Sequence, residues 1–157
     1  MSKFSAPVST QMSISEQLQA VRAQISAPGA PFELDDIEVA GQTYRIFKNA
    51  PANLAELIEH ARGFGDKVFL VYQGERWTFK HFFEHVDALR SQLRNHYAIG
   101  KGDRVAIAMR NRPEWMAAYA AIILSGGVAV PLNSWGLRDE LLYGLQDSQP
   151  KLLFCDA

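Results

Sequence analysis

Residues 104–132, RVAIAMRNRPEWMAAYAAIILSGGVAVPL, combine the patterns that decide the fold. Residues 104–109 form an apolar run of strand length. Residues 113–124 are apolar on every side, which predicts a buried helix. The Ser-Gly-Gly sequence at 125–127 ends that helix, as glycines do at helix C-termini. Residues 128–132 again have the composition of a buried strand. The stretch therefore predicts a strand, a covering helix and a second strand.

The pattern continues toward the C-terminus. Residues 137–146 predict a helix with Leu141, Leu142 and Leu145 on one face, and residues 151–155 predict a third strand. Connections this short predict parallel strands joined by right-handed crossovers. The expected fold class is thus α/β, with a β-α-β-α-β parallel unit.

Toward the N-terminus, an amphipathic helix precedes this unit. Thr78 is placed to open it, and its apolar face comprises Phe79, Phe82, Val86, Leu89 and Leu93. A hairpin is predicted over residues 68–78, and a helix capped by Asn53 before it. The helix should therefore bury its phenylalanines against the parallel unit.

The first residues predict simpler elements. Ser13 and Glu16 have the spacing of a capping box, so a helix is expected from Ser13. Residues 32–47 predict a second hairpin. The expected organisation is a disordered tail at 1–12, a helix and linker at 13–31, and an α/β subdomain at 32–157.

Composition excludes several function classes. The chain has 157 residues, a formal net charge of −1 and a single cysteine. This charge gives no reason to expect nucleic acid as a partner, and one cysteine excludes an internal disulfide framework. No signal-peptide core and no apolar run long enough to span a membrane are present in the sequence, so a cytoplasmic location is predicted.

The sequence HFFEH at 81–85 has the spacing of one class of zinc peptidase, in which two histidines hold the metal and the Glu is the base. Such a site needs a third ligand. The later histidine, His96, lies in the turn after the same helix, and Glu84 lies nearly opposite the apolar face. The pattern favours two solvated histidines, and no metal site is predicted.

Two glycine-containing stretches and the cysteine are further candidates for chemical sites. Residues 100–102 precede a strand, whereas a phosphate-binding loop follows one. Residues 125–127 close a helix and so present carbonyl groups instead of free amides. Cys155 has no histidine placed by pattern to activate it, which favours an ordinary strand residue. None of these positions is predicted to be catalytic.

Polar and aromatic residues follow the first two parallel strands. Arg110 and Arg112 come after the first strand, and Asn133, Ser134 and Trp135 come after the second. Ligands of open α/β sheets bind at the carboxyl ends of the strands. These five are the best-placed candidates for ligand contact, although they also suit a solvated loop with one packing tryptophan.

Five segments in order resemble the adenylate-forming (AMP-binding) superfamily, which includes acyl-CoA synthetases, luciferases and the adenylation domains of peptide synthetases. They are Thr78-Phe79, Gly102–Ile107, Pro113-Glu114-Trp115, Leu124–Asn133 and Asp147–Leu153. Phe47–Pro51 and the turn Asn133–Trp135 look most like fatty-acid–CoA ligases. The resemblance covers residues from about 32 to the end of the chain.

The resemblance implies ATP-dependent activation of a carboxylic acid, of which a fatty acid is the expected type. The acid attacks the α-phosphate of ATP to give an acyl-adenylate, and the thiol of CoA then displaces AMP. ATP, Mg²⁺ and CoA are the implied cofactors of the longer enzyme. The turn Asn133, Ser134, Trp135 is expected to border the CoA side.

The family's phosphate loop and its mobile C-terminal catalytic domain have no counterpart in these 157 residues. The resemblance therefore implies the N-terminal portion of a ligase that is inactive alone, with no catalytic residue of its own. Exposed apolar surface is expected to favour self-association. The alternative is a stand-alone α/β module that binds a nucleotide or CoA, or that interacts with another protein.

Overall fold

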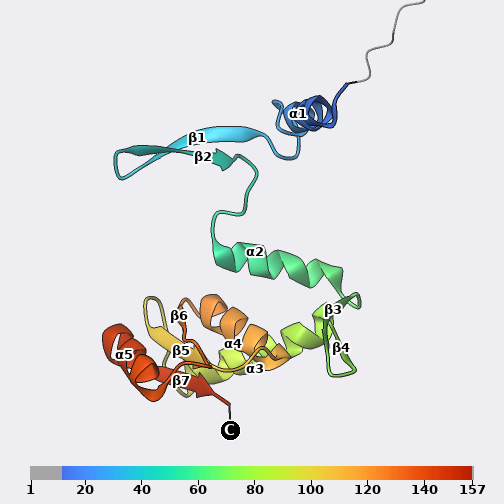
Figure 1. Cartoon of the computed structure of the whole chain (residues 1–157). Coiled ribbons are helices and arrows are strands. Elements are labelled where there is room, and N and C mark those ends of the chain that lie inside the picture. Colours follow the sequence, from blue (N-terminus) through green and yellow to red (C-terminus); the bar gives the residue numbers. More distant parts are fainter. Residues whose placement is uncertain (1–11, 157) are drawn as a thin grey trace, which may run out of the picture. The chain divides into compact units, whose positions relative to one another are not determined.

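The structure, a computed structural model, describes residues 12–156. The chain divides into two compact units, of which unit 1 ends at Pro51 and unit 2 begins at Ala52 (Figure 1). The boundary predicted from the sequence lies after residue 31, which places the first hairpin in the larger subdomain. The disordered tail predicted for 1–12 lies outside the described residues except for Met12.

Within residues 12–51, unit 1 contains the predicted helix and hairpin. Helix α1 (Ile14–Ile25) begins with a capping box, in which the Ser13 N–H donates to the Glu16 carboxylate at 2.7 Å and the Glu16 N–H donates to the Ser13 hydroxyl at 3.3 Å. Strands β1 (Leu34–Val39) and β2 (Gln42–Phe47) pair antiparallel. Their two-residue turn has positive φ at Ala40 and Gly41, as a type I′ turn requires.

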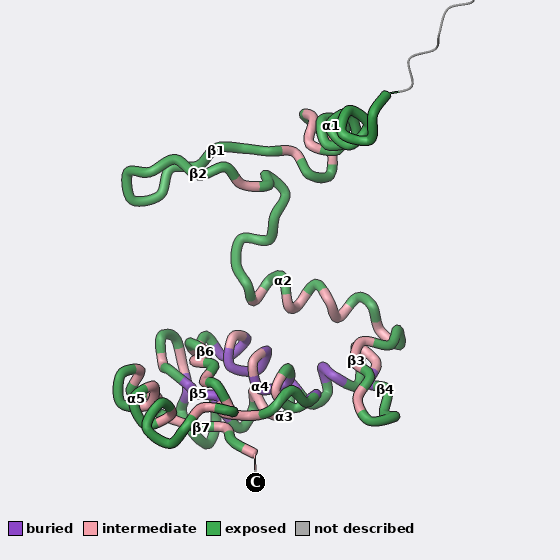
Figure 2. Tube along the Cα trace, in the orientation of Figure 1, coloured by how far each residue is buried: buried purple, intermediate pink, exposed green. Residues whose placement is uncertain are grey.

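Unit 1 has no buried residue within positions 12–51, and Figure 2 shows buried residues only in unit 2. Along α1, Ile14, Leu18 and Val21 are 77%, 62% and 53% exposed. On one face of the hairpin, Ile37 and Tyr44 pair across the strands and are also exposed. The helix and the hairpin thus form by local rules without a core of their own.

Unit 2 holds the helices α2 (Leu54–His60), η1 (Ala61–Phe64), α3 (Phe79–Asn95), α4 (Pro113–Leu124) and α5 (Arg138–Ser148). Its strands are β3 (Val68–Tyr72), β4 (Glu75–Thr78), β5 (Arg104–Ala108), β6 (Val128–Pro131) and β7 (Leu152–Cys155). The predicted caps are confirmed, because Asn53 accepts from the Glu56 N–H at 2.9 Å and Thr78 accepts from the His81 N–H at 3.1 Å.

The parallel unit is confirmed. Strands β5, β6 and β7 form a parallel sheet in the order β6-β5-β7. Val105, Ala106 and Ile107 of the central strand β5 are each 0% exposed. Strand β5 lies between two neighbours, so its backbone pairs on both sides and its side chains are buried on both faces.

The core lies between α3, α4 and one face of this sheet. On the face that joins the core, Val105 of β5 pairs with Ala129 of β6 and Leu152 of β7. The next residues along the strands, Ala106, Val130 and Leu153, point to the other face. Helix α4 is buried over most of its surface, as expected of a helix without a polar face. The core residues of α3 are Phe82, Phe83, Val86 and Leu93.

Arg62 joins α2 and η1 to α3. Its guanidinium donates to Asp87 on α3 at 2.6 Å and to Glu59 on α2 at 2.5 Å, and it lies 4.2 Å from the centre of the Phe83 ring. These carboxylates hold the pKa of Arg62 above its usual value, Asp87 having the larger effect. The contact therefore attaches α2 to the core through charge and ring packing together.

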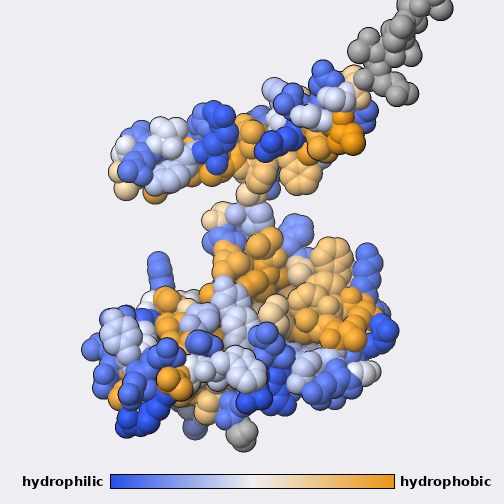
Figure 3. All heavy atoms as spheres, in the orientation of Figure 1, coloured by the Kyte–Doolittle hydropathy of each residue, from blue (hydrophilic) through white to orange (hydrophobic). Residues whose placement is uncertain are grey.

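The other face of the sheet is less covered. Helix α5 contributes no buried residue, and Leu153 and Val128 are 39% and 46% exposed. Figure 3 shows hydrophobic atoms at the surface of both units. Among the helices of residues 12–156, none combines the length and hydropathy that a membrane span requires.

We expect Leu93→Ala to destabilise unit 2 by about 2–5 kcal/mol, because a fully buried leucine leaves a cavity when it is truncated. Urea denaturation followed by tryptophan fluorescence measures the change. The matched control is Leu142→Ala on α5, where the side chain is 40% exposed and the expected loss is under about 1 kcal/mol. Equal losses for the two variants would contradict this location of the core.

Candidate functional site

Four side chains that follow the three parallel strands, together with Tyr72 at the end of β3, lie in one region of unit 2. We call Tyr72, Arg110, Arg112, Trp135 and Asp156 the strand-end cluster. Arg110 and Arg112 follow β5, Trp135 follows β6 and Asp156 follows β7. Tyr72 joins Arg110, Arg112 and Asp156 in lining a polar hollow of about 400 Å³. The cluster lies where open α/β sheets bind ligands.

Asp156 connects the ends of β5 and β7. Its carboxylate accepts a hydrogen bond from the Arg110 N–H at 2.7 Å and a longer one from Arg112 Nη1 at 3.4 Å. These donors hold the pKa of Asp156 below its usual range, and the Arg110 N–H has the larger effect. Asp156 is therefore an anion at neutral pH that positions the loop after β5.

Arg110 and Trp135 form a cation–π pair. The Arg110 guanidinium carbon lies 4.5 Å from the centre of the Trp135 ring, and Trp135 is 75% exposed. None of the ion pairs within residues 12–156 uses the Arg110 guanidinium. The guanidinium lies over one face of the ring, so the pair combines an exposed aromatic side chain with a positive charge, which suits a planar group that carries an anion.

Asn133 stabilises the turn after β6 through two hydrogen bonds. Its side-chain oxygen accepts a hydrogen bond from the Trp135 N–H at 3.1 Å, and its carbonyl accepts one from the Gly136 N–H at 2.9 Å. A Cβ at Gly136 would lie 2.9 Å from that carbonyl oxygen, so a side chain at this position would strain the turn. Asn133 thus orients Trp135, and Ser134 between them is half-buried.

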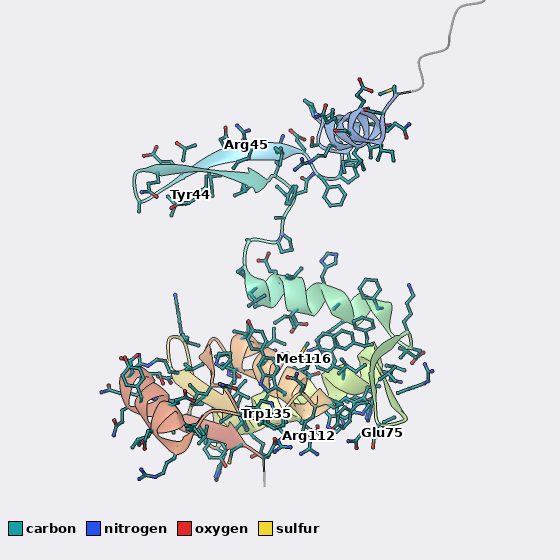
Figure 4. All side chains as sticks on the ribbon, viewed as in Figure 1. Tyr44, Arg45, Glu75, Arg112, Met116 and Trp135 are labelled. Atoms are coloured by element: carbon teal, nitrogen blue, oxygen red, sulfur yellow. The ribbon has the colours of Figure 1, made fainter. Side chains whose placement is uncertain are left out.

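The five residues selected from the sequence divide into two groups. The structure places Arg110, Arg112 and Trp135 in the strand-end cluster. Figure 4 labels Arg112 and Trp135. Asn133 and Ser134 belong to the supporting turn. Sequence reasoning did not single out Asp156 or Tyr72. The signal for Asp156 was available, because parallel pairing of residues 105–108 with 152–155 leaves residue 156 at the same sheet edge.

The histidines of HFFEH pack around Trp77. The rings of His85 and Trp77 stack with 4.6 Å between centres, and the Nε2 atoms of His81 and His85 are 3.3 Å apart. Glu84 is exposed, as predicted, and lies 3.6 Å from His81. Residues 12–156 contain no group of three or more side chains placed to hold a metal ion. The geometry of this region is that of aromatic packing.

The two glycine stretches form turns, as predicted: one precedes β5 and the other ends α4. The Gly100 N–H donates to the Asp103 carboxylate at 3.0 Å in the turn before β5. Gly126 ends α4 with φ of 85°, a left-handed conformation that glycine adopts without strain. Cys155 is exposed at the end of β7. These residues build the turns that set the strand ends and leave the strand-end cluster as the candidate site.

The class that this fold and site define is confirmed by comparison: the chain belongs to the family of AMP-binding enzymes, whose sequence model matches residues 57–157. It is 34% identical over 100 residues to a 2-succinylbenzoate–CoA ligase of Bacillus velezensis, covering 64% of this chain and 20% of that one. It is 30% identical over 97 residues to a long-chain-fatty-acid–CoA ligase of Bacillus subtilis, covering 62% and 17%.

A solved structure shares this architecture. The N-terminal subdomain of NpsA from Klebsiella oxytoca, in complex with anthranilyl-AMSN, superposes with a TM-score of 0.61 and 27% identity. The match covers 66% of this chain and 27% of that one. The chain spans about a fifth of the length of the curated relatives that it matches. The sequence-based recognition and the expected fold class are thereby confirmed.

We expect the carboxyl group of Asp156 to titrate below the usual value of about 3.9. Arg112→Gln should raise its pKa only part of the way, because the stronger donor, the Arg110 N–H, remains. An NMR titration of the side-chain carbonyl carbon measures both values. A return to the usual pKa in Arg112→Gln would show that Arg112 is the main cause instead.

The same shift predicts a pH dependence of stability. Because the folded-state pKa is lowered, the ionised carboxylate stabilises the fold above pH about 4, and this contribution is lost as the pH falls through the folded-state pKa. The difference in unfolding free energy between wild type and Asp156→Asn should therefore be constant from pH 5 to 7 and shrink below pH 4. A difference that grows on acidification would contradict the sign.

Proposed function

We propose that this chain forms the N-terminal part of an ATP-dependent acyl-CoA ligase. The single observation that carries the proposal is the family match over residues 57–157, the segment that builds the parallel sheet and the strand-end cluster. In the proposed reaction a carboxylate attacks the α-phosphate of ATP, releasing pyrophosphate and forming an acyl-adenylate. The thiol of CoA then attacks the acyl carbon, and AMP leaves.

The part proposed for this chain is to border the CoA nucleotide. CoA carries an adenine ring and phosphate groups, and the Arg110–Trp135 pair offers an exposed ring and a cation 4.5 Å apart. A ring face suits stacking, and a guanidinium suits a phosphate. Asn133 would keep Trp135 in place through its hydrogen bond to the Trp135 N–H. We assign no catalytic residue and no Mg²⁺ ligand to this chain.

The proposed substrate class is a small carboxylic acid, with a fatty acid as the specific candidate. The curated relatives include ligases of 2-succinylbenzoate and of long-chain fatty acids. The fatty-acid proposal is supported by the resemblance at Phe47–Pro51 and Asn133–Trp135. A cytoplasmic location accompanies the proposal as the prediction from composition.

We expect the purified 157-residue chain to show no acid-dependent exchange between ATP and pyrophosphate, because it carries no phosphate-binding loop. The control is a full-length relative such as the 2-succinylbenzoate–CoA ligase, assayed with its own acid. A chimera in which residues 57–157 replace the matching segment of that relative should recover exchange. Exchange by the short chain, or a folded chimera without exchange, would contradict the proposal.

The chimera also tests the CoA contact. Trp135→Ala should raise the KM for CoA while leaving the ATP–pyrophosphate exchange unchanged, because stacking on an exposed ring contributes only to the second half-reaction. Trp135→Phe, which keeps a ring face, is the matched control. A loss of exchange in Trp135→Ala would place the residue in adenylation or in folding instead.

A second candidate is an interaction module that self-associates through unit 1. The observation in its favour is the exposed apolar stripe of Ile14, Leu18, Val21 and Ile25 on α1. Clustered exposed apolar side chains mark protein interaction surfaces. Stable CoA binding by the short chain would instead favour a stand-alone nucleotide-binding module.

For self-association, we expect Leu18→Glu to lower both the sedimenting mass of the chain at high concentration and its binding of a hydrophobic dye, because the charge interrupts the stripe. Ala23→Glu adds the same charge on the opposite side of α1 and is the control. Analytical ultracentrifugation over a concentration series measures the effect. Wild-type chain that stays monomeric without binding dye would exclude this candidate.

A further inference from the structure

Two histidines at the start of α3 have ring nitrogens close enough to share one ion. His81 and His85 are one helical turn apart, and their Nε2 atoms lie 3.3 Å from each other. The catalytic zinc site suggested by the HFFEH spacing needs three protein ligands, and residues 12–156 contain no such group. A chelate with two protein ligands needs only this histidine pair, because water can complete the coordination of a metal ion.

The separation of the two nitrogens suits a tetrahedral ion. Imidazole nitrogens bind Zn²⁺ at about 2.0–2.1 Å. Two such bonds to nitrogens 3.3 Å apart enclose an angle of about 107°, which is close to the tetrahedral angle of about 109°. The right angle of a square-planar ion such as Cu²⁺ would bring the two nitrogens to about 2.9 Å instead. The observed distance therefore favours Zn²⁺.

Trp77 restricts both histidine rings. The ring of His85 stacks on Trp77, and the ring of His81 contacts it edge-on with 4.9 Å between centres. Trp77 is itself fixed, because it is 8% exposed and its Nε1–H donates to the Glu75 carboxylate at 3.2 Å. Figure 4 labels Glu75 next to α3. Since packing already orders the two rings, they lose little side-chain entropy when they bind an ion.

Glu84 provides a negative charge beside the pair. Its carboxylate lies 3.6 Å from His81 Nδ1, which is longer than a hydrogen bond, and its charge favours a proton on that atom. A proton on Nδ1 leaves the lone pair of Nε2 free for a metal, as in carboxylate–histidine–zinc arrangements. The first turn of a helix disfavours a cation, and the carboxylate of Glu84 offsets this effect.

We propose that His81 and His85 bind one Zn²⁺ ion through their Nε2 atoms, with water in the other positions. In the structure the two atoms are close enough for one ring to donate an Nε2–H to the other. Zn²⁺ takes the place of this proton, which moves to Nδ1 of its own ring. The ion then joins the two residues across one turn of α3. The pair shares no residue with the strand-end cluster, and the proposal is independent of the proposed ligase function.

The test is a titration of the whole 157-residue chain with ZnCl₂, followed by NMR of the imidazole nitrogens. The Nε2 signals of His81 and His85 should shift together and reach saturation at one ion per chain. The signals of the other two histidines, His60 and His96, should not move at the same zinc concentration. Excess EDTA should restore the original spectrum. Equal shifts at all four histidines, or a shift of only one member of the pair, would overturn the proposal.

Single substitutions test the chelate. His81→Gln and His85→Gln should each weaken zinc binding about a hundredfold, because one imidazole alone loses the gain of a second ligand held nearby. The His81 side chain is 48% exposed, so His81→Gln leaves the core intact. His96→Gln, at the other end of the same helix, is the matched control and should bind zinc as wild type does. Equal affinities in wild type and His81→Gln would overturn the proposal.

A second ion and a further variant separate chelation from a general effect of charge. MgCl₂ at the same concentrations should leave the imidazole signals unchanged, because Mg²⁺ prefers oxygen ligands. Glu84→Gln should weaken zinc binding about tenfold and lower the fraction of His81 with its proton on Nδ1, which the nitrogen shifts report without zinc. Glu38→Gln on the hairpin of unit 1 is the matched control. Equal responses to Mg²⁺ and Zn²⁺ would overturn the proposal, and unchanged zinc binding in Glu84→Gln would overturn the part assigned to Glu84.

Discussion

The burial of β5 is the constraint on which the rest of unit 2 depends. Val105, Ala106 and Ile107 are fully buried, and the strand pairs with β6 on one side and β7 on the other. A strand buried on both faces must be apolar throughout and must find a partner for every backbone group. Helix α4 covers one face, and the strand ends that β5 aligns carry the candidate site.

In the strand-end cluster, the residues of the candidate site also hold the strand ends together. Asp156 joins β7 to the loop after β5 by accepting a hydrogen bond from the Arg110 N–H. This contact fixes the backbone from which the Arg110 and Arg112 side chains extend. Tyr72 and Arg112 line both the polar hollow at these strand ends and an apolar pocket between β3 and α4. The candidate site is therefore a feature of the sheet edge, and the contacts that fix this edge also fix the site.

Unit 1 has a different physical character. Its helix and hairpin satisfy their backbone groups through the Ser13–Glu16 capping box and the β1–β2 pairing. They bury no side chain within residues 12–51, so their apolar faces remain available to other surfaces. The family match begins at residue 57 and does not include this unit. The feature of interest in unit 1 is therefore its exposed apolar surface, whereas in unit 2 it is the candidate ligand site.

The sequence by itself determined the elements and the family. Strand and helix periods, the caps at Ser13, Asn53 and Thr78, and the glycines after α4 act over a few residues, so their signals are local. Parallel pairing followed from the short connections, and the arginines and Trp135 followed from the strand-end rule. Only the tertiary structure decided that Asp156 braces the Arg110 loop and that β3 forms a cleft with α4. These contacts join residues tens of positions apart, and no local pattern specifies which side chains meet across that distance.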